Sequence, residues 1–192
     1  MGLRERKKLK TRAAIRRAAH RLVGAQGYET TTIEQIARAA EVSPSTVLRY
    51  FATKEDIVLD DAYEPLMEAA LRARPPGEEP LESLRVVITG AVRAQLEAEP
   101  AETAQRARLL AEVPAVRARL SESLSGTSHL LARVLAERAG RAPDDLSVRV
   151  CTAAVTGALR EVLLHWATTG AEEDLLTLTD EAFTTLKSGF RL

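Results

Sequence analysis

Residues 27–57 contain two short helical patterns joined by a tight turn, and this arrangement restricts the fold more than any other part of the sequence. The apolar residues of the first pattern recur at i, i+3, i+4 and i+7, which marks one face of a helix. They are Ile33, Ile36, Ala37 and Ala40. Thr32 stands just before this face and Gln35 follows three residues later, the spacing of a capping box. A helix is therefore expected to begin after Thr32.

The second pattern predicts a helix that starts at Ser43-Pro44, after a turn at Glu41-Val42, with Ser as the N-cap and Pro in the first helical position. Its inner face is apolar and aromatic: Val47, Tyr50 and Phe51. Its outward side chains are small, polar or cationic: Ser45, Thr46 and Arg49. A short helix that is supported by another and presents such side chains suits the major groove of DNA. The sequence thus predicts a helix-turn-helix.

The same stretch, GYETTTIEQIARAAEVSPSTVLRYFATKEDI, resembles the N-terminal signature of TetR-family (tetracycline-repressor-like) transcriptional regulators. The resemblance includes the helix end near Gly27-Tyr28, the Thr-Thr before the first short helix, the Val-Ser turn and the Arg-Tyr-Phe that precedes Lys54. One position departs from it. Leu48 stands where the family usually carries an aromatic residue, often a tyrosine that touches DNA, so the resemblance does not supply that contact here.

The formal net charge of zero conceals a segregation of charge along the chain. Up to Lys54 there are 12 Lys and Arg residues against 4 Asp and Glu residues, a balance of +8, and the rest has 15 against 23, a balance of −8. A basic end on an acidic remainder is typical of a protein that docks one end onto phosphate. Arginine abundance alone can also reflect the composition of a genome, but the segregation of sign is harder to explain in that way.

Other functional classes have little support in the sequence. No apolar run is long enough to cross a membrane, and the N-terminus lacks the apolar segment of a signal peptide, so a cytoplasmic location is expected. Cys151 is the sole cysteine, which excludes an intramolecular disulfide, and the three histidines form no cluster at metal-ligand spacing. No nucleophile paired with a base is recognisable. Neither an enzyme nor a metal or cofactor site is therefore expected.

The expected fold is all-α, because no stretch alternates apolar and polar residues long enough to argue for a strand. A three-helix helix-turn-helix domain is expected over residues 1–53, and a larger helical effector-binding and dimerisation domain over residues 54–192. The first domain opens with a helix over residues 4–26, and a long helix from Lys54 to Ala73 opens the second. Further helices are expected at 80–98, 101–112, 114–139, 143–169 and 172–188.

Candidate DNA-binding residues lie in and around the two short helices. Ser45, Thr46 and Arg49 are expected to read base edges, since arginine can donate to both acceptors of a guanine and a hydroxyl can bond a base or a phosphate. The other candidates would contact the backbone and set the register: Thr31, Thr32, Ser43, Tyr50 and Lys54. The alternative is a solvated helix face, with Thr32 acting only as a cap.

Two apolar stripes near the C-terminus are expected to form a homodimer interface. Their residues are Cys151, Val155, Ala158, Val162 and Trp166 in the first and Leu175, Phe183 and Leu186 in the second. Paired across a two-fold axis they would make a four-helix bundle, which the TetR resemblance also implies. The alternative is that both stripes pack only against their own chain.

The resemblance further implies a small-molecule effector bound within the helical body. Six polar or adaptable residues are candidates for lining its cavity: Tyr63, Met67, Arg108, Glu112, His129 and Arg160. Each could instead be a surface or ion-pairing residue. Because the surrounding helices are mostly aliphatic, the expected effector is largely apolar, such as a lipid-like, acyl or aromatic metabolite.

These patterns together predict a ligand-responsive, sequence-specific transcriptional regulator. The expected form is a homodimeric repressor that a small effector releases from a palindromic operator in double-stranded DNA. Two other classes stay open at this stage. One is a non-specific architectural DNA binder without an effector, and the other is an enzyme or carrier on a similar helical scaffold.

Overall fold

The computed structural model describes residues 2–60 and 63–189, and in this part of the chain it contains ten helices and no strand. The expected all-α class is confirmed. The chain divides into two compact units, Met1–Ala62 and Tyr63–Leu192, which we call the head and the body. The division falls after Ala62, whereas the boundary expected from the sequence lay after residue 53.

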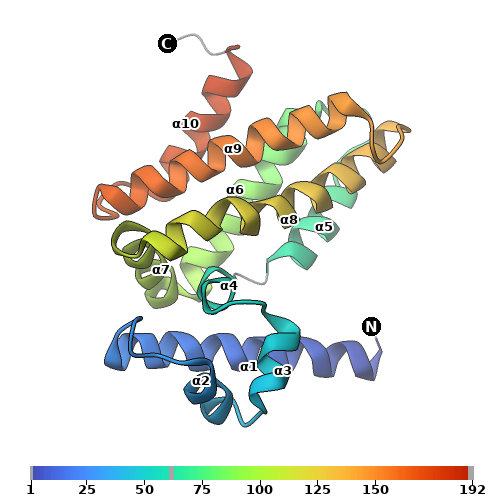
Figure 1. The fold of residues 1–192 in the computed structure, drawn as a ribbon. Coiled ribbons are helices and arrows are strands. Elements are labelled where there is room, and N and C mark those ends of the chain that lie inside the picture. The colour runs from blue at the N-terminus through green and yellow to red at the C-terminus, as the bar shows by residue number, and fades with distance from the viewer. Residues whose placement is uncertain (1, 61–62, 190–192) are drawn as a thin grey trace. The chain divides into compact units, whose positions relative to one another are not determined.

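The head consists of α1 (Leu3–Gln26), α2 (Ile33–Ala39), α3 (Pro44–Tyr50) and α4 (Lys54–Leu59), as Figure 1 shows. α1 packs against α2 and α4, and α2 packs against α3. The buried side chains between them form one core: Ile15, Ala18, Ala19, Ile36, Ala37, Val47, Phe51 and Ile57. Burial of this apolar surface stabilises the head and fixes which face of α3 points outward.

Local signals set the ends of the head helices. Thr32 caps α2 and Thr53 caps α4, and each belongs to a complete capping box. The Ser43 side chain caps α3. α1 ends at Gly27, whose φ of 89° is open to glycine and strained for other residues. These four positions agree with the ends expected from the sequence.

The turn between α2 and α3 holds Glu41 in the left-handed region, at a φ of 55°. Two hydrogen bonds close the turn, because the N–H of Glu41 donates to the carbonyl of Arg38 and the N–H of Val42 donates to that of Ala37. In this region the Cβ of an L-residue crowds the following carbonyl oxygen, at a cost of about 1 kcal/mol. The turn that positions α3 is therefore held under local strain.

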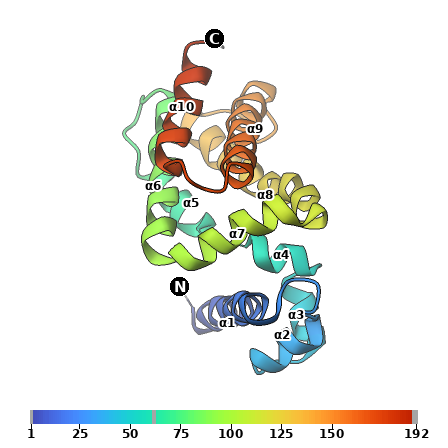
Figure 2. The same ribbon diagram turned by 90° about the vertical axis from the view of Figure 1, so that its left-hand side faces the viewer.

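The body consists of α5 (Glu64–Arg72), α6 (Pro80–Ala98), α7 (Pro100–Glu112), α8 (Pro114–Ala139), α9 (Leu146–Thr168) and α10 (Leu175–Lys187). α9 packs against α7, α8 and α10, while α5 packs against α6 and α8. Figures 1 and 2 show α9 running between α8 and α10. The interior is mainly aliphatic, and its fully buried side chains include Leu84, Leu110 and Leu131.

Carboxylates cap three of the body helices: Glu79 caps α6, Asp145 caps α9 and Asp174 caps α10. The pKa of Asp174 is lowered because its carboxylate accepts hydrogen bonds from the hydroxyl and the N–H of Thr177. Arg141 lowers the pKa of Asp145, and the N–H groups at the start of α9 add to this effect. In the head, by contrast, the N-cap side chains of α2, α3 and α4 are hydroxyls of Thr and Ser.

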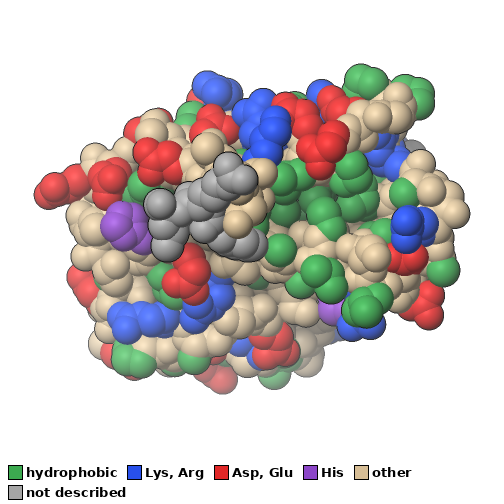
Figure 3. All heavy atoms as spheres, turned by 90° about the horizontal axis from the view of Figure 1, so that it is seen from above, with side chains coloured by type: hydrophobic (Ala, Val, Ile, Leu, Met, Phe, Trp, Pro, Cys, Tyr) green, Lys and Arg blue, Asp and Glu red, His purple; other side chains and the backbone are tan. Residues whose placement is uncertain are grey.

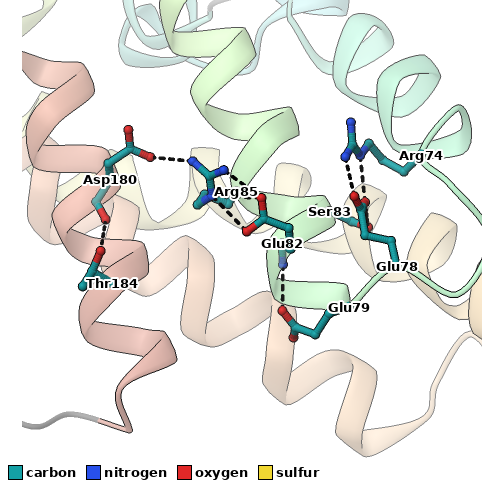
Figure 4. Close-up of polar contacts among 8 residues, drawn as sticks. All are labelled: Arg74, Glu78, Glu79, Glu82, Ser83, Arg85, Asp180 and Thr184. Carbon is teal, nitrogen blue, oxygen red and sulfur yellow. Dashed lines mark hydrogen bonds and ion pairs between the residues drawn. The ribbon is translucent and has the colours of Figure 1, made fainter.

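Ion pairs connect the beginning of α6 to its neighbours (Figure 4). Nη1 of Arg85 lies 3.0 Å from Oδ1 of Asp180 on α10. In the α5–α6 loop, Nε of Arg74 donates to Glu78 at 2.8 Å, and the hydroxyl of Ser83 donates to the same carboxylate at 2.6 Å. Arg74 and then Ser83 lower the pKa of Glu78 to about 2.

The long helix expected from Lys54 to Ala73 is two helices in the structure, so this prediction was wrong. α4 ends at Leu59, Asp60 has an extended backbone with φ −66° and ψ 123°, and α5 begins at Glu64. Pro65 is the second residue of α5. A proline has no N–H for a helical hydrogen bond, and its ring clashes with the carbonyl four residues earlier. The apolar periodicity across residues 54–73 predicts one continuous helix and gives no sign of this break.

The other expected helices are confirmed to within three residues at each end. In the part of the chain that the structure describes, none of the helices is both long and apolar enough to cross a lipid bilayer.

Candidate nucleic-acid interface

Three hydroxyl groups cluster at the N-terminal end of α3. Oγ of Ser43 lies 2.9 Å from both Oγ of Ser45 and Oγ1 of Thr46. It also accepts a hydrogen bond from the N–H of Thr46 at 3.1 Å, which satisfies one of the free N–H groups at the helix start. Ser43 and Ser45 are exposed, and Thr46 is half-buried. Hydroxyl groups both donate and accept, so this cluster can rearrange toward a base or a phosphate.

Arg49 and Tyr50 lie at the other end of α3. Arg49 is exposed, and its guanidinium carbon lies 5.7 Å from the centroid of the Tyr50 ring, a cation–π distance. Tyr50 is half-buried and packs against the head core, so its ring supports the guanidinium from one side. Arg49 offers a planar fork of donors that matches the two acceptors of a guanine edge.

Leu48 adds an apolar side chain to the same part of α3. It is 53% exposed, although its neighbour Val47 is fully buried. Ser45 and Arg49, three residues before and one residue after it, are also exposed. The sequence predicts only that Leu48 does not supply the aromatic DNA contact that is usual at this position. The structure shows that it belongs to the outward face that carries the candidate base-reading residues.

Lys54 is tied to the turn that precedes α2. Its Nζ donates to the carbonyl of Tyr28 at 2.8 Å and to that of Thr31 at 3.0 Å, and it lies 3.9 Å from the centroid of the Tyr28 ring. Two of the three ammonium donors are therefore directed inside the head. The structure gives Lys54 a role in joining α4 to this turn. A phosphate contact through its third donor stays a prediction.

The hydroxyl of Tyr28 donates a hydrogen bond to Oε1 of Glu55 on α4. Burial raises the pKa of Tyr28 well above its ordinary value, and the hydrogen bond to Glu55 raises it further. Burial would also raise the pKa of Glu55, but the hydrogen bond from Tyr28 and those from nearby donors outweigh it, so this pKa is lowered. The proton therefore resides on the tyrosine and the charge on the glutamate, which ties the end of α1 to α4.

Thr31 was expected to contact a phosphate through its side chain, and the structure contradicts this. The residue is 1% exposed, and its hydroxyl donates to the carbonyl of Gly27 at 2.7 Å. A side chain buried in this way closes the turn between α1 and α2 and does not reach a ligand. Thr32 is exposed while it caps α2, and a phosphate contact there stays a prediction.

The six residues expected to line an effector cavity differ in their burial. Tyr63 and Met67, at the start of α5, are buried. Arg160 is half-buried, and its Nε donates to Oγ of Ser121 at 2.9 Å. The remaining three are exposed: Arg108, Glu112 and His129. Their exposure argues against a role in lining an interior pocket.

The residues expected at a dimer interface largely pack within their own chain. Five are buried in the body: Val155, Val162, Trp166, Leu175 and Phe183. The other three are half-buried: Cys151, Ala158 and Leu186. Several of the eight line a small apolar recess between α9 and α10. Its volume of about 10 Å³ has room for about one water molecule. For the five buried residues, the alternative of packing within the chain is therefore the observed one.

A second side of α9 is exposed, and its two large apolar residues were not singled out from the sequence. Leu146 is 71% exposed and Val150 is 57% exposed. Ala153, Ala154 and Gly157 continue this exposed set at helical spacing. Figure 3 shows hydrophobic side chains gathered on the face of the molecule that α9 and α10 help to form. The sequence signal was present, because α9 is apolar on two sides.

The structure offers no metal site within residues 2–60 and 63–189. No group of three or more His, Cys, Asp or Glu side chains in that part of the chain lies together in a way that could hold an ion.

Two family models match the chain. The model of bacterial regulatory proteins of the tetR family matches residues 15–60, and the model of the MftR C-terminal domain matches residues 78–191. The first match contains α2 and α3 completely, and the second contains α6 to α10.

Similar curated proteins are regulators. The HTH-type transcriptional regulator TcmR of Streptomyces glaucescens is 39% identical over 180 residues, which are 86% of this chain and 76% of that protein. The fatty acid metabolism regulator protein of Bacillus subtilis is 24% identical, and the match covers 90% of this chain and 91% of the relative.

Similar solved structures include FadR of Thermus thermophilus, a TetR-family transcriptional repressor in complex with lauroyl-CoA. It is 25% identical with a TM-score of 0.56, and the match covers 94% of this chain and 95% of that one.

Proposed function

The chain belongs to the TetR family of bacterial transcriptional regulators, and we propose that it is a repressor that binds a palindromic operator as a homodimer. In this proposal the protein leaves the operator when a small, largely apolar effector binds the body. The observation that carries this proposal is the outward face of α3. That face presents Ser45, Leu48 and Arg49 on a helix whose opposite side is buried in the head core. A helix of this kind fits the major groove, where base edges are read.

The charge of the chain supports DNA as the partner of this face. The segment up to Lys54 carries a balance of +8, while the rest of the chain carries −8. Phosphate attracts the first and repels the second, so a duplex approaches the end that carries α3.

The outward face of α9 supports a homodimer. Its exposed apolar residues Leu146 and Val150 lie beside small residues that allow two helices to approach closely. An isologous pairing about a two-fold axis would cover this face in both copies. Two heads related by that axis would read two half-sites of a palindrome about one helical turn apart.

An acyl-type effector is supported by two of the similar proteins. One is a fatty acid metabolism regulator by name, and the other is described in complex with lauroyl-CoA. The mainly aliphatic interior of the body suits an acyl chain, and Tyr63 and Met67 are buried candidates to contact it. Such an effector lowers operator affinity if it binds the DNA-free conformation more tightly than the DNA-bound one.

Selection of bound sites from random duplex DNA, repeated at two salt concentrations, tests the proposal. An enriched palindrome whose binding persists at the higher salt is the expected result. If no sequence is enriched and the affinity collapses with salt, only the electrostatic part of binding remains. The protein would then be a non-specific architectural binder.

The effector is tested next with the selected operator. Lauroyl-CoA and stearoyl-CoA are expected to release the protein from the DNA, whereas coenzyme A without an acyl chain is the matched control. Release by coenzyme A alone, or by none of the three, would contradict an acyl-type effector and leave the DNA-binding function intact.

A further inference from the structure

Leu48 is the most exposed of the large apolar side chains described in the head. Of the apolar side chains of α3, Val47 is fully buried and Tyr50 packs partly on the core, but Leu48 is 53% exposed. A single exposed leucine is ordinary on a protein surface, but this one lies on α3 beside the exposed Ser45 and Arg49. The position is therefore a candidate for contact with a partner.

The surroundings of Leu48 indicate which partner. Ser45 lies three residues earlier on the same helical face, and Arg49 follows directly. The α3 sequence PSTVLRY contains no carboxylate, and the segment up to Lys54 has a balance of +8. An apolar side chain framed by a hydroxyl and a guanidinium, on the basic end of the chain, is complementary to a base edge flanked by phosphates.

We propose that Leu48 is a specificity-determining residue that recognises the C5-methyl group of a thymine in the operator. This inference rests on the proposed function, because it requires that α3 enter the major groove. In that groove the base edges present hydrogen-bond donors and acceptors, and the thymine methyl is the apolar group among them. Leucine cannot satisfy a donor or an acceptor, so it favours thymine and disfavours the polar edges of the other bases.

The position of that thymine follows from helix geometry. Side chains three or four residues apart on a helix have Cβ atoms about 5–6 Å apart, and base pairs stack at about 3.4 Å. Ser45 is three residues before Leu48, so the thymine read by Leu48 is within about two base pairs of the base read by Ser45. In a palindromic site it occurs once in each half.

The test replaces each thymine of the selected operator in turn by deoxyuridine, which removes only the methyl group. Wild-type protein is expected to lose about fourfold in affinity when the recognised thymine is replaced in one half-site, and about fifteenfold when both are replaced. Leu48→Ala is expected to bind both forms of the operator equally. The comparison is a double-mutant cycle that isolates the contact between side chain and methyl group.

A matched control is Leu66→Ala, which removes a similarly exposed leucine from α5 of the body. This variant is expected to keep the full preference for thymine over deoxyuridine. Thermal unfolding of Leu48→Ala should match wild type, since the side chain contributes little buried surface.

Three results would overturn the proposal, and they differ from one another. Equal binding of the thymine and deoxyuridine operators by wild type, with preference over random DNA retained, would remove Leu48 as a reader and leave the regulator standing. A loss of operator affinity in Leu48→Ala that is independent of the methyl group would assign it a contact with sugar or backbone. No preference for any sequence would overturn both this inference and the proposed function.

Discussion

At the scale of single residues, Arg49 and Lys54 are both cations of the head but have different surroundings. Arg49 is exposed and rests against one aromatic ring, so its donors face solvent. Lys54 directs two hydrogen bonds to backbone carbonyls of the turn before α2. The first arrangement suits recognition of a partner, and the second suits stabilisation of the head itself.

Arg49→Ala is expected to weaken operator binding by about 1–3 kcal/mol and binding to random DNA by much less, because a bidentate contact to guanine is lost only on the operator. Fluorescence anisotropy with both duplexes measures the difference. Arg108→Ala removes an exposed arginine from the body and should change neither affinity. Equal losses on the two duplexes would show that Arg49 contacts phosphate and reads no base.

Lys54→Ala is expected to lower the free energy of unfolding by about 1–2 kcal/mol, since two carbonyls lose a charged donor that is only partly exposed. Chemical denaturation of the full chain measures this change. Lys187→Ala, at the exposed end of α10, is the matched control. Unchanged stability combined with a smaller salt dependence of DNA binding would instead assign Lys54 to phosphate.

At the scale of helices and turns, most of the head could be predicted because its signals are local. Thr32, Ser43 and Thr53 are caps that act on N–H groups within the next three residues, so a sequence pattern suffices to find them. Pro65 is also a local signal, but the apolar spacing across residues 54–73 favours one continuous helix and outweighs it in the sequence pattern. The burial of Thr31 was not predictable in this way, because it depends on how the turn packs.

The surroundings of the body candidates also depend on packing between helices. A helical pattern identifies an apolar face but does not say which neighbour covers it. α9 is apolar on two sides, and the residues chosen for the dimer, such as Val155 and Trp166, lie on the side that packs within the chain. The exposed side with Leu146 and Val150 could be distinguished only once α8 and α10 were in place.

The turn between α2 and α3 gives a prediction at the same scale. Glu41→Gly is expected to raise the free energy of unfolding by about 0.5–1 kcal/mol, because relief of left-handed strain exceeds the entropy that glycine gains in the unfolded chain. Denaturant titration of this variant and of the wild type measures the change in the free energy of unfolding. Glu34→Gly, within the regular helix α2, should have the opposite sign. A loss of stability at both positions would argue against strain at Glu41.

At the scale of the whole molecule, the exposed face of α9 leads to a prediction about assembly. Val150→Glu is expected to weaken self-association by about tenfold or more, because an isologous interface would bring two added carboxylates together. Sedimentation velocity across a concentration series measures this, and circular dichroism confirms folding. Leu66→Glu is the control, since it adds the same charge at a residue exposed to a similar degree on α5. A dimer that survives Val150→Glu would place the interface elsewhere.

The chemistry of the helix caps makes the folding of the two units respond differently to protons. Among the described residues, hydrogen bonds and ion pairs lower the pKa of two carboxylates in the head and of six in the body. They are Glu34 and Glu55 in the head, and Glu68, Glu78, Glu82, Glu137, Asp145 and Asp174 in the body. A carboxylate whose pKa is lower in the folded protein than in the unfolded chain stabilises the fold at any pH above its unfolded pKa. This stabilisation is lost as the pH falls through the pKa of the folded protein.

Because more of these carboxylates lie in the body, its unfolding is expected to take up more protons than that of the head. For Glu78 the window runs from its ordinary pKa of 4.5 down to about 2. The N-cap hydroxyls of α2, α3 and α4 do not titrate, although the capping box of α4 also contains the Asp56 carboxylate. Acid titration followed by two-dimensional NMR is expected to lose the body signals at a higher pH than the head signals, and the reverse order would contradict this. An acidified solution would thus leave a DNA reader that no longer has a working sensor.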